Sequence, residues 1–235
     1  MPAAVVAYAA GRRLEALWLN ELGGLTYRVG DELVLKWAPA GTALDLAAEA
    51  ERLAWAASFV TVPAVVDSGS DRDGRWLVTA LLPGENAVTP RWLADPATAV
   101  AAVGAGLRAL HDRLPVARCP FDWSAAARVA DAQRRGVDPV LLQGLSPPPE
   151  VDRLVVCHGD ACAPNTLITD DGRWSGHVDL GQLGVADRWA DLAVATWSTQ
   201  WNYGDGWEQP LLDAYGVDAD PERTDYYRRL WDVGP

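Results

Sequence analysis

The residues with the clearest capacity for chemistry are three oxygen-bearing side chains in the second half of the chain. Asp160 and Asn165 lie in the segment His158-Gly-Asp-Ala-Cys-Ala-Pro-Asn165, and Asp179 opens Asp179-Leu-Gly181 further on. Mg²⁺ prefers hard oxygen ligands, and phosphoryl transfer needs a positioned metal, neutralised charge and an acceptor for an alcohol proton. We therefore expect Asn165 and Asp179 to bind Mg²⁺, and Asp160 to accept or orient the proton of the attacking hydroxyl.

A single lysine, Lys36, stands among nineteen arginines. Lysine is a compact point charge on a flexible stem, whereas arginine is a rigid planar fork. Residues 31–37 alternate in the manner of a strand, and residues 45–59 carry a helical apolar stripe with Glu49 at its border. A carboxylate in that position needs a partner or water. We expect Glu49 to pair with Lys36, and Lys36 to hold the α- and β-phosphates of a nucleotide.

The elements that must position Lys36 are mainly strands. A hairpin is expected around the Gly30-Asp31 turn, formed by residues 21–29 and 31–37. Its first strand contains the pair Gly23-Gly24, whose amides could approach phosphate, although most such pairs are simply turns. Further strands are expected at residues 62–67 and 75–80, with a polar turn over residues 68–74.

Helical patterns dominate after a lobe boundary near residues 82–86. Helices are expected at residues 97–114 and 123–135, and residues 143–150 are expected to form a loop. A buried strand at residues 154–157 precedes the Asp160 segment, and a hairpin of residues 166–169 and 174–179 follows it. The chain from residue 187 onward is expected to be mainly helical. This order of elements predicts an α+β fold with two lobes, residues 1–82 and 83–235.

Composition limits the partners. The formal charge of −12 argues against a nucleic-acid or anionic-membrane partner. No apolar run is long enough to span a membrane, and the N-terminus lacks the basic leader of a signal peptide. The three cysteines form no metal-type pair and fit a reducing cytoplasm.

The combined pattern resembles the aminoglycoside phosphotransferase family, relatives of the eukaryotic protein kinases, and most closely the branch that acts on the 3′-hydroxyl. The similarity is carried by residues 155–165, residues 176–193, Leu110-His111 and Cys119-Pro120-Phe121. The resemblance implies a protein-kinase-like fold, with a five-stranded sheet and one helix in the first lobe and a largely helical second lobe. It also implies Mg²⁺ and ATP or GTP as cofactors, with the nucleotide between the lobes.

The same resemblance assigns roles to further residues. It places the adenine edge near the backbone of Ala80 to Leu82, with Val34 as another nucleotide-binding residue. His158 would organise the catalytic loop rather than act as an acid or base. Asp187, Arg188 and Asp191 would brace that loop from beneath, whereas His111 and His177 are interpreted as core or surface residues.

The sequence departs from the family pattern on the acceptor side. Where the family often carries an acid or an arginine, this chain has Ala163 and Gln182, and later acids give way to Trp197 and Trp201. Tryptophan offers a flat apolar surface with one hydrogen-bond donor. We expect Trp189 and Trp197 to be core residues, and we take five others as acceptor-binding candidates: Trp201, Asp205, Trp207, Trp231 and Asp232.

The leading hypothesis is an enzyme that inactivates an aminoglycoside by phosphorylating a hydroxyl group. The same chemistry on a nucleoside antibiotic of the capuramycin type, or on a cyclic peptide, stays open. A metabolic kinase acting on homoserine, choline or a sugar amine is a weaker alternative, as is a nucleotide-binding pseudokinase. The expected partner is a small-molecule antibiotic, and the sequence leaves both a monomer and a homodimer open.

Overall fold

The computed structural model of the protein describes residues 2–20, 22–145 and 147–234. It divides the chain into two compact units, Met1–Leu82 and Pro83–Pro235, called here the N-terminal lobe and the helical lobe. No helix in the described ranges is both long and apolar enough to cross a membrane.

The N-terminal lobe is built on one antiparallel sheet with the strand order β1-β2-β3-β5-β4. Its strands are β1 (Leu14–Leu19), β2 (Leu25–Val29), β3 (Leu33–Pro39), β4 (Val65–Ser70) and β5 (Gly74–Ala80). The hairpin predicted around Gly30-Asp31 is confirmed, since β2 and β3 pair from Leu25–Trp37 to Val29–Leu33. Strand β3 lies in the middle of the sheet, so Lys36 is flanked by the hydrogen-bonded strands β2 and β5.

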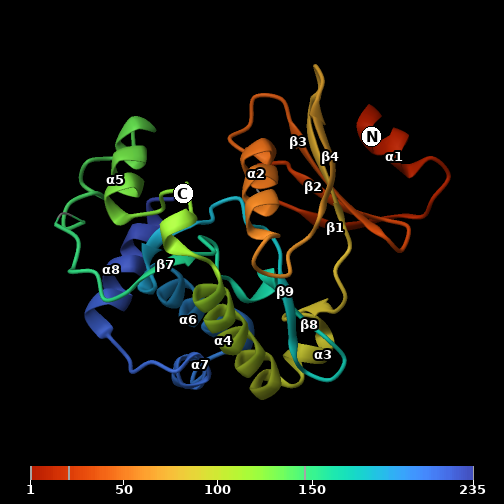
Figure 1. Ribbon diagram of the computed structural model, residues 1–235. Helices are drawn as coiled ribbons and strands as arrows, with labels where there is room; N and C mark the ends of the chain where they lie inside the picture. The colour runs from red at the N-terminus through yellow and green to blue at the C-terminus, as the bar shows by residue number, and fades with distance from the viewer. Residues whose placement is uncertain (1, 21, 146, 235) are drawn as a thin grey trace. The chain divides into compact units, whose positions relative to one another are not determined.

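A helix packs on each face of this sheet, as Figure 1 shows. On one face Leu35 is fully buried in a cluster with Val5 of α1 (Ala3–Ala9) and Val78 of β5. On the other face lies α2 (Leu46–Ala56), whose N-terminus is capped by Asp45 accepting from the Ala48 amide. The alternation along β3 thus directs Leu35 toward α1 and Lys36 toward α2.

Three expectations for this lobe need correction. The strand predicted for residues 21–29 begins only at Leu25, and Glu21 lies outside the described residues. The strand predicted for residues 62–67 is displaced to Val65–Ser70, because Pro63 cannot donate to a ladder and the register shifts between Val65 and Asp67. The five-stranded sheet implied by the resemblance is confirmed, although no residue pattern located β1, and the single helix implied with it is wrong, because α1 is a second helix.

The helical lobe is formed by six helices of the described chain: α3 (Pro90–Leu93), α4 (Pro96–Arg113), α5 (Ala125–Arg134), α6 (Trp189–Tyr203), α7 (Glu208–Tyr215) and α8 (Pro221–Asp232). Helix α4 packs on α7, and α6 packs on both α7 and α8. Ten of the fifteen residues of α6 are buried, which makes it the central helix of this lobe.

Short strands in the helical lobe carry the segment that contains Asp160. Strand β7 (Leu154–Cys157) pairs with β10 (Gly184–Asp187), and β8 (Thr166–Ile168) pairs with β6 (Glu85–Asn86) and β9 (Trp174–His177). A single 3₁₀ turn, Ala163–Asn165, lies between β7 and β8. The predicted strand at residues 154–157 and the predicted hairpin are confirmed, although β9 ends at His177 rather than Asp179.

Candidate active site

The catalytic-loop candidates Asp160 and Asn165 are in direct contact. The Asn165 side-chain amide donates to the Asp160 backbone carbonyl and to Asp160 Oδ2, both at 3.0 Å. The Asn165 amide nitrogen is therefore committed to the loop, which leaves its carbonyl oxygen as the atom suited to a cation. Asp160 Oδ1 is buried and has no hydrogen-bond partner within the described structure. A buried carboxylate oxygen of this kind fits the approach of a metal ion or a hydroxyl.

The environment of Asp160 changes its acidity. Burial raises the pKa of this carboxyl, and the charge of Asp179 raises it further. Interactions with His158, Cys162 and Asn165 lower the pKa of Asp160, but burial outweighs them. A carboxylate with a raised pKa is a stronger base than an ordinary aspartate. This is the property required of a group that takes a proton from an alcohol.

Asp179 follows the β8–β9 hairpin with a left-handed backbone. Its φ is 64°, a region that non-glycine residues enter only at a cost, aspartate and asparagine most easily. Its neighbour is anchored, because the Val178 amide donates to the Asn165 carbonyl at 3.0 Å. The backbone bond joins the neighbour of Asp179 to Asn165, and Asp179 lies near enough for its charge to raise the pKa of Asp160. Asp160, Asn165 and Asp179 therefore form one cluster of oxygen-bearing side chains.

His158 connects the two segments of this cluster. Its Nε2 donates to the Val178 carbonyl at 3.0 Å, and its Nδ1 accepts from the Asp160 amide at 3.2 Å. Both ring nitrogens are thus committed to backbone groups, which fixes the tautomer of the ring. This geometry gives His158 an organising role, with neither nitrogen left for proton transfer.

Asp191 braces the same loop from within the core. It is fully buried, with Oδ2 accepting from the His158 amide at 2.6 Å and Oδ1 accepting from the Gly159 amide at 2.9 Å. His111 Nε2 lies 2.9 Å from Asp191 Oδ2, and His111 Nδ1 lies 2.9 Å from the Tyr215 hydroxyl. His111 is therefore a core residue, which is one of the two positions expected for it. Through Asp191 it also supports the loop that carries Asp160.

His111, Cys157 and Asp191 are close enough to be considered as ligands of a second metal ion. The Cys157 thiol, however, donates to the Asp187 carbonyl at 3.4 Å, and burial raises its pKa well above the usual range. Metal binding would require the thiolate. Asp191 already accepts from two backbone amides and lies 2.9 Å from His111, so these three side chains are committed to hydrogen bonds within the core rather than to a metal.

Asp187 and Arg188 stabilise the start of α6. The Asp187 carboxylate accepts from the Trp189 amide at 3.0 Å and from the Asp152 amide at 2.8 Å. Arg188 Nε donates to Asp152 Oδ2 at 2.5 Å, and the Trp189 indole donates to the same oxygen at 3.1 Å. Asp152, which the sequence did not single out, joins α6 to the segment that precedes β7.

In the N-terminal lobe, Lys36 and Glu49 form the expected ion pair. Lys36 Nζ donates to Glu49 Oε1 at 2.7 Å, and Glu49 is only 5% exposed. A partly buried, charge-assisted bond of this length fixes the ammonium group more firmly than a surface ion pair would. Val34 lies two residues before Lys36 on the same face of β3 and is partly buried.

The other nucleotide-binding candidates have clear local roles. The Gly23 amide donates to the Asn20 carbonyl at 3.0 Å, and the Gly24 amide donates to Asn20 Oδ1 at 2.7 Å. Both amides thus bond within the β1–β2 turn, and Gly23 has a φ of 80° that favours glycine. Ala80 ends β5, and Leu82 is the last residue of this lobe.

The acceptor candidates occupy the ends of three helices in the helical lobe. Trp201 lies on the last turn of α6, and Asp205 and Trp207 lie between α6 and α7. Trp231 and Asp232 are the last two residues of α8. The carbonyls of Val233 and Gly234, which follow them, accept from the side chain of Arg135, the residue after α5. Trp189 is buried as expected. The expectation for Trp197 is wrong, because the residue is only partly buried and its ring lies tilted against that of Trp201, with centroids 5.0 Å apart and planes at 39°.

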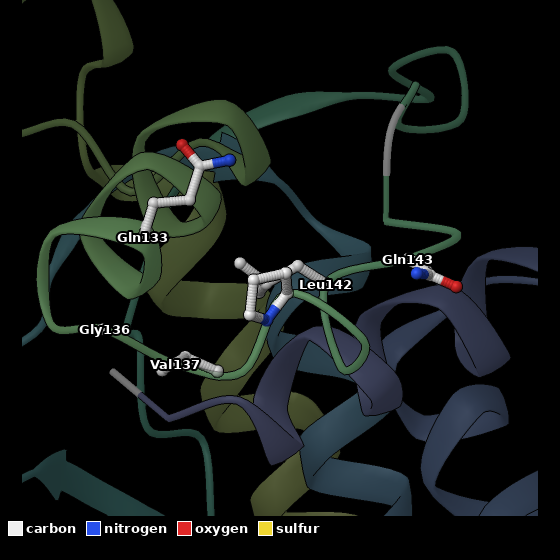
Figure 2. A pocket seen from close by; sticks show the side chains of 6 residues that line it. Gln133, Gly136, Val137, Leu142 and Gln143 are labelled. Atoms are coloured by element: carbon white, nitrogen blue, oxygen red, sulfur yellow. The ribbon is translucent and has the colours of Figure 1, made fainter.

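A hollow of about 480 Å³ lies elsewhere in the helical lobe, between the end of α5 and the loop that follows it (Figure 2). The loop is held by α8, because the Tyr226 hydroxyl donates to the Leu145 carbonyl at 2.8 Å. The lining contains no ionisable side chain and no catalytic-loop residue: it consists of Gln133, Gly136, Val137, Pro139, Leu142 and Gln143.

Ser198 is a site residue that the sequence analysis missed. Its hydroxyl accepts from the Ala163 amide at 2.9 Å and so attaches the catalytic loop to α6. Asn202, one turn further along, donates to the Ser198 hydroxyl at 3.1 Å and to its carbonyl at 2.8 Å. The available signal was weak, a polar pair at i and i+4 in a helix that also carries Asp191, Thr196, Thr199 and Gln200.

Comparison with known proteins relates this geometry to a family. The model of the phosphotransferase enzyme family matches residues 20–227. An aminoglycoside 3′-phosphotransferase of Streptomyces fradiae is 37% identical, over 82% of this chain and 81% of that protein. The crystal structure of an aminoglycoside-3′-phosphotransferase of type VIII has a TM-score of 0.81 at 32% identity, covering 98% of this chain and 97% of the other.

A further solved structure contains ligands. It is the aminoglycoside phosphotransferase APH(3″)-Id of Streptomyces rimosus in complex with ADP and streptomycin, with a TM-score of 0.70 at 27% identity over 91% of this chain and 93% of that one. The match to the family model, residues 20–227, covers parts of both lobes and the segment from Asp160 to Asp179. The chain therefore belongs to the phosphotransferase enzyme family and, within it, to the aminoglycoside phosphotransferases, kinases that act on antibiotic hydroxyl groups.

Proposed function

We propose that this protein is a Mg²⁺-dependent kinase of the aminoglycoside 3′-phosphotransferase type, which transfers the terminal phosphoryl group of ATP or GTP to a hydroxyl of an antibiotic. The observation that carries the proposal is the cluster of Asp160, Asn165 and Asp179, with a buried unpartnered oxygen on Asp160. The identity of three relatives as aminoglycoside phosphotransferases, two of them named for the 3′ position, supports the acceptor class.

In this mechanism each residue has one task. Asp160 accepts or orients the proton of the attacking hydroxyl, and His158 and Asp191 hold its backbone in place through the bonds described above. Asn165 and Asp179 provide oxygen ligands for Mg²⁺, which supplies charge neutralisation on the phosphates when it is bound. Lys36, fixed by Glu49, binds the α- and β-phosphates. Val34, Gly23, Gly24, Ala80 and Leu82 are proposed to line the nucleotide.

The acceptor class is tested by expressing the gene in an antibiotic-sensitive host. We expect growth on a panel of aminoglycosides and a rise in the inhibitory concentration that disappears in the Asp160→Asn variant. A parallel panel of capuramycin-type nucleosides and cyclic peptides tests the other acceptors. If the host were protected only on this second panel, the acceptor would be one of these compounds and not an aminoglycoside. Protection on neither, with purified protein inactive on all these compounds, would refute it.

Substituting arginine for the lone lysine tests the phosphate-binding role. Lys36→Arg should lower kcat/KM for the nucleotide by about tenfold or more, because a planar guanidinium cannot take the place of an ammonium held 2.7 Å from Glu49. The measurement is steady-state kinetics with varied nucleotide. Arg72→Lys is the matched control, since Arg72 is an exposed residue between β4 and β5. Near-normal kinetics for Lys36→Arg would mean that Lys36 only stabilises the lobe.

A further inference from the structure

The short 3₁₀ turn Ala163–Asn165 is held from outside the catalytic loop. Within the turn, the Asn165 amide donates to the Cys162 carbonyl at 3.0 Å, and Pro164 has no amide to donate. The Ala163 amide stands at the start of the turn, where Cys162 supplies no side-chain cap. Its acceptor is the Ser198 hydroxyl of α6, at 2.9 Å. Ser198 therefore does the work of a cap and joins the turn to α6.

That turn carries the side chain proposed to bind Mg²⁺. Asn165 is its last residue, and the side-chain amide of Asn165 donates to Asp160 at 3.0 Å. The Asn165 carbonyl accepts from the amide of Val178, the residue before Asp179. Pro164 fixes one backbone angle in the middle of the turn, which makes the turn stiff. A shift of the turn would therefore move the Asn165 carboxamide oxygen relative to Asp179.

Ser198 is itself held in one orientation. It is fully buried, and the side-chain amide of Asn202 donates to its hydroxyl at 3.1 Å and to its carbonyl at 2.8 Å. A serine hydroxyl has two acceptor sites, which the amides of Ala163 and Asn202 occupy. The neighbouring Thr199 hydroxyl instead donates to the Thr196 carbonyl of its own helix at 2.7 Å. Ser198 thus bonds to the loop, and Asn202 keeps it in that orientation.

We propose that Ser198 and Asn202 are positioning residues for the metal site, and that they act on the Asn165 oxygen through the Ala163 amide. Neither side chain is itself a ligand in this proposal. Groups that orient a metal ligand usually change the affinity for the metal by about 10- to 100-fold. The pair should therefore determine how tightly the enzyme binds the complex of Mg²⁺ with a nucleoside diphosphate or triphosphate. The proposal deepens the proposed function and rests on it.

The first test measures nucleotide binding by calorimetry, with ADP in the presence of Mg²⁺ and with ADP in the presence of EDTA. Ser198→Ala should weaken binding of Mg²⁺–ADP by about tenfold and leave ADP binding in EDTA within about twofold. Thr199→Val is the matched control, because it removes a hydroxyl of the same buried helix that bonds only within the helix. Wild-type affinity of Ser198→Ala for Mg²⁺–ADP, or an equal loss in Thr199→Val, would overturn the proposal.

The second test uses Asn202→Ala, which leaves the bond between Ser198 and the Ala163 amide possible and so perturbs the fold less. Its affinity for Mg²⁺–ADP should fall by a few-fold, in line with the loss of one hydrogen bond. The double variant Ser198→Ala/Asn202→Ala should bind no more weakly than Ser198→Ala, because Asn202 acts through Ser198. Additive losses in the double variant, or no loss in Asn202→Ala, would overturn the pairing.

Hydrogen exchange gives a readout without metal or nucleotide. The Ala163 amide should exchange faster in Ser198→Ala and in Asn202→Ala than in wild type, and at the wild-type rate in Thr199→Val. An Ala163 amide that exchanges equally in all four proteins would overturn the attachment. Failure of the proposed function would show in the wild-type protein itself, as ADP binding that is the same with Mg²⁺ and with EDTA. Failure of this inference alone would leave the Mg²⁺ dependence of the wild-type protein intact.

Discussion

Replacing Asp160 by asparagine should lower kcat by about 10²–10⁴-fold, the usual contribution of a positioned proton acceptor. Asparagine has nearly the same shape, so it can still accept the bond that Asn165 donates at 3.0 Å. It cannot take up a proton at neutral pH. Since the proposed role of the carboxylate is in the chemical step rather than in nucleotide binding, the nucleotide affinity should change by only a few-fold. Stopped assays of ADP formation give kcat, and calorimetry gives nucleotide affinity.

The Asp160 experiment has a charge-matched control. Asp218→Asn removes one carboxylate from an exposed position between α7 and α8 and should leave both parameters unchanged. If Asp160→Asn retained most of the wild-type kcat, another group would have to accept the alcohol proton. If instead it abolished metal-dependent nucleotide binding, Asp160 would have to be reassigned as a metal ligand.

The local part of this site could be predicted because its signals are short-range. The β2–β3 hairpin, the strand at residues 154–157 and the hairpin after Asn165 each carry alternation and turn residues within a few positions. The pair of Lys36 and Glu49 followed from one rule, that a carboxylate at an apolar border needs a partner. The sequence could therefore predict those parts of the site whose residues lie in elements that are close together along the chain.

The missed elements depend on packing rather than on local pattern. Strand β1 is exposed along nearly its whole length, so Leu17, Trp18 and Leu19 give no alternation to detect. Helix α1 has no side-chain cap and is seven residues long, and the burial of Val5 against the sheet stabilises it. Trp197 was misassigned for a similar reason, since only the tertiary position of Arg228 and Trp201 shows that its ring is not core.

Replacing Asp191 by alanine should destabilise the protein by about 3–5 kcal/mol, the cost of removing one partner from a buried charged network. The change leaves the amides of His158 and Gly159 and the ring of His111 without their acceptor. Asp191→Asn should also be destabilising, because its NH₂ group would face one of these N–H donors. Urea denaturation followed by circular dichroism at pH 7 measures both effects, and kcat should fall as the loop loses its support.

The pH dependence distinguishes this role from simple space filling. Burial would raise the pKa of Asp191, but the hydrogen bond and charge of His111, together with His158 and the Gly159 amide, outweigh burial and lower it. A lowered pKa means that Asp191 stabilises the fold above the unfolded pKa of about 3.9 and loses this contribution as the pH falls through the folded value. The difference in the free energy of unfolding between wild type and Asp191→Ala should therefore become smaller below about pH 4.

Asp187 provides the opposite case on the same stretch of chain. Burial raises the pKa of Asp187, so its contribution to stability is fully present at low pH and declines as the pH rises through the folded pKa. The difference in the free energy of unfolding between wild type and Asp187→Asn should grow as the pH is lowered, whereas the difference for Asp191→Ala should shrink. Parallel trends for the two variants would mean that the charge of Asp191 does not hold the catalytic loop. Opposite trends would identify Asp191 as the ionised anchor on which the position of Asp160 depends.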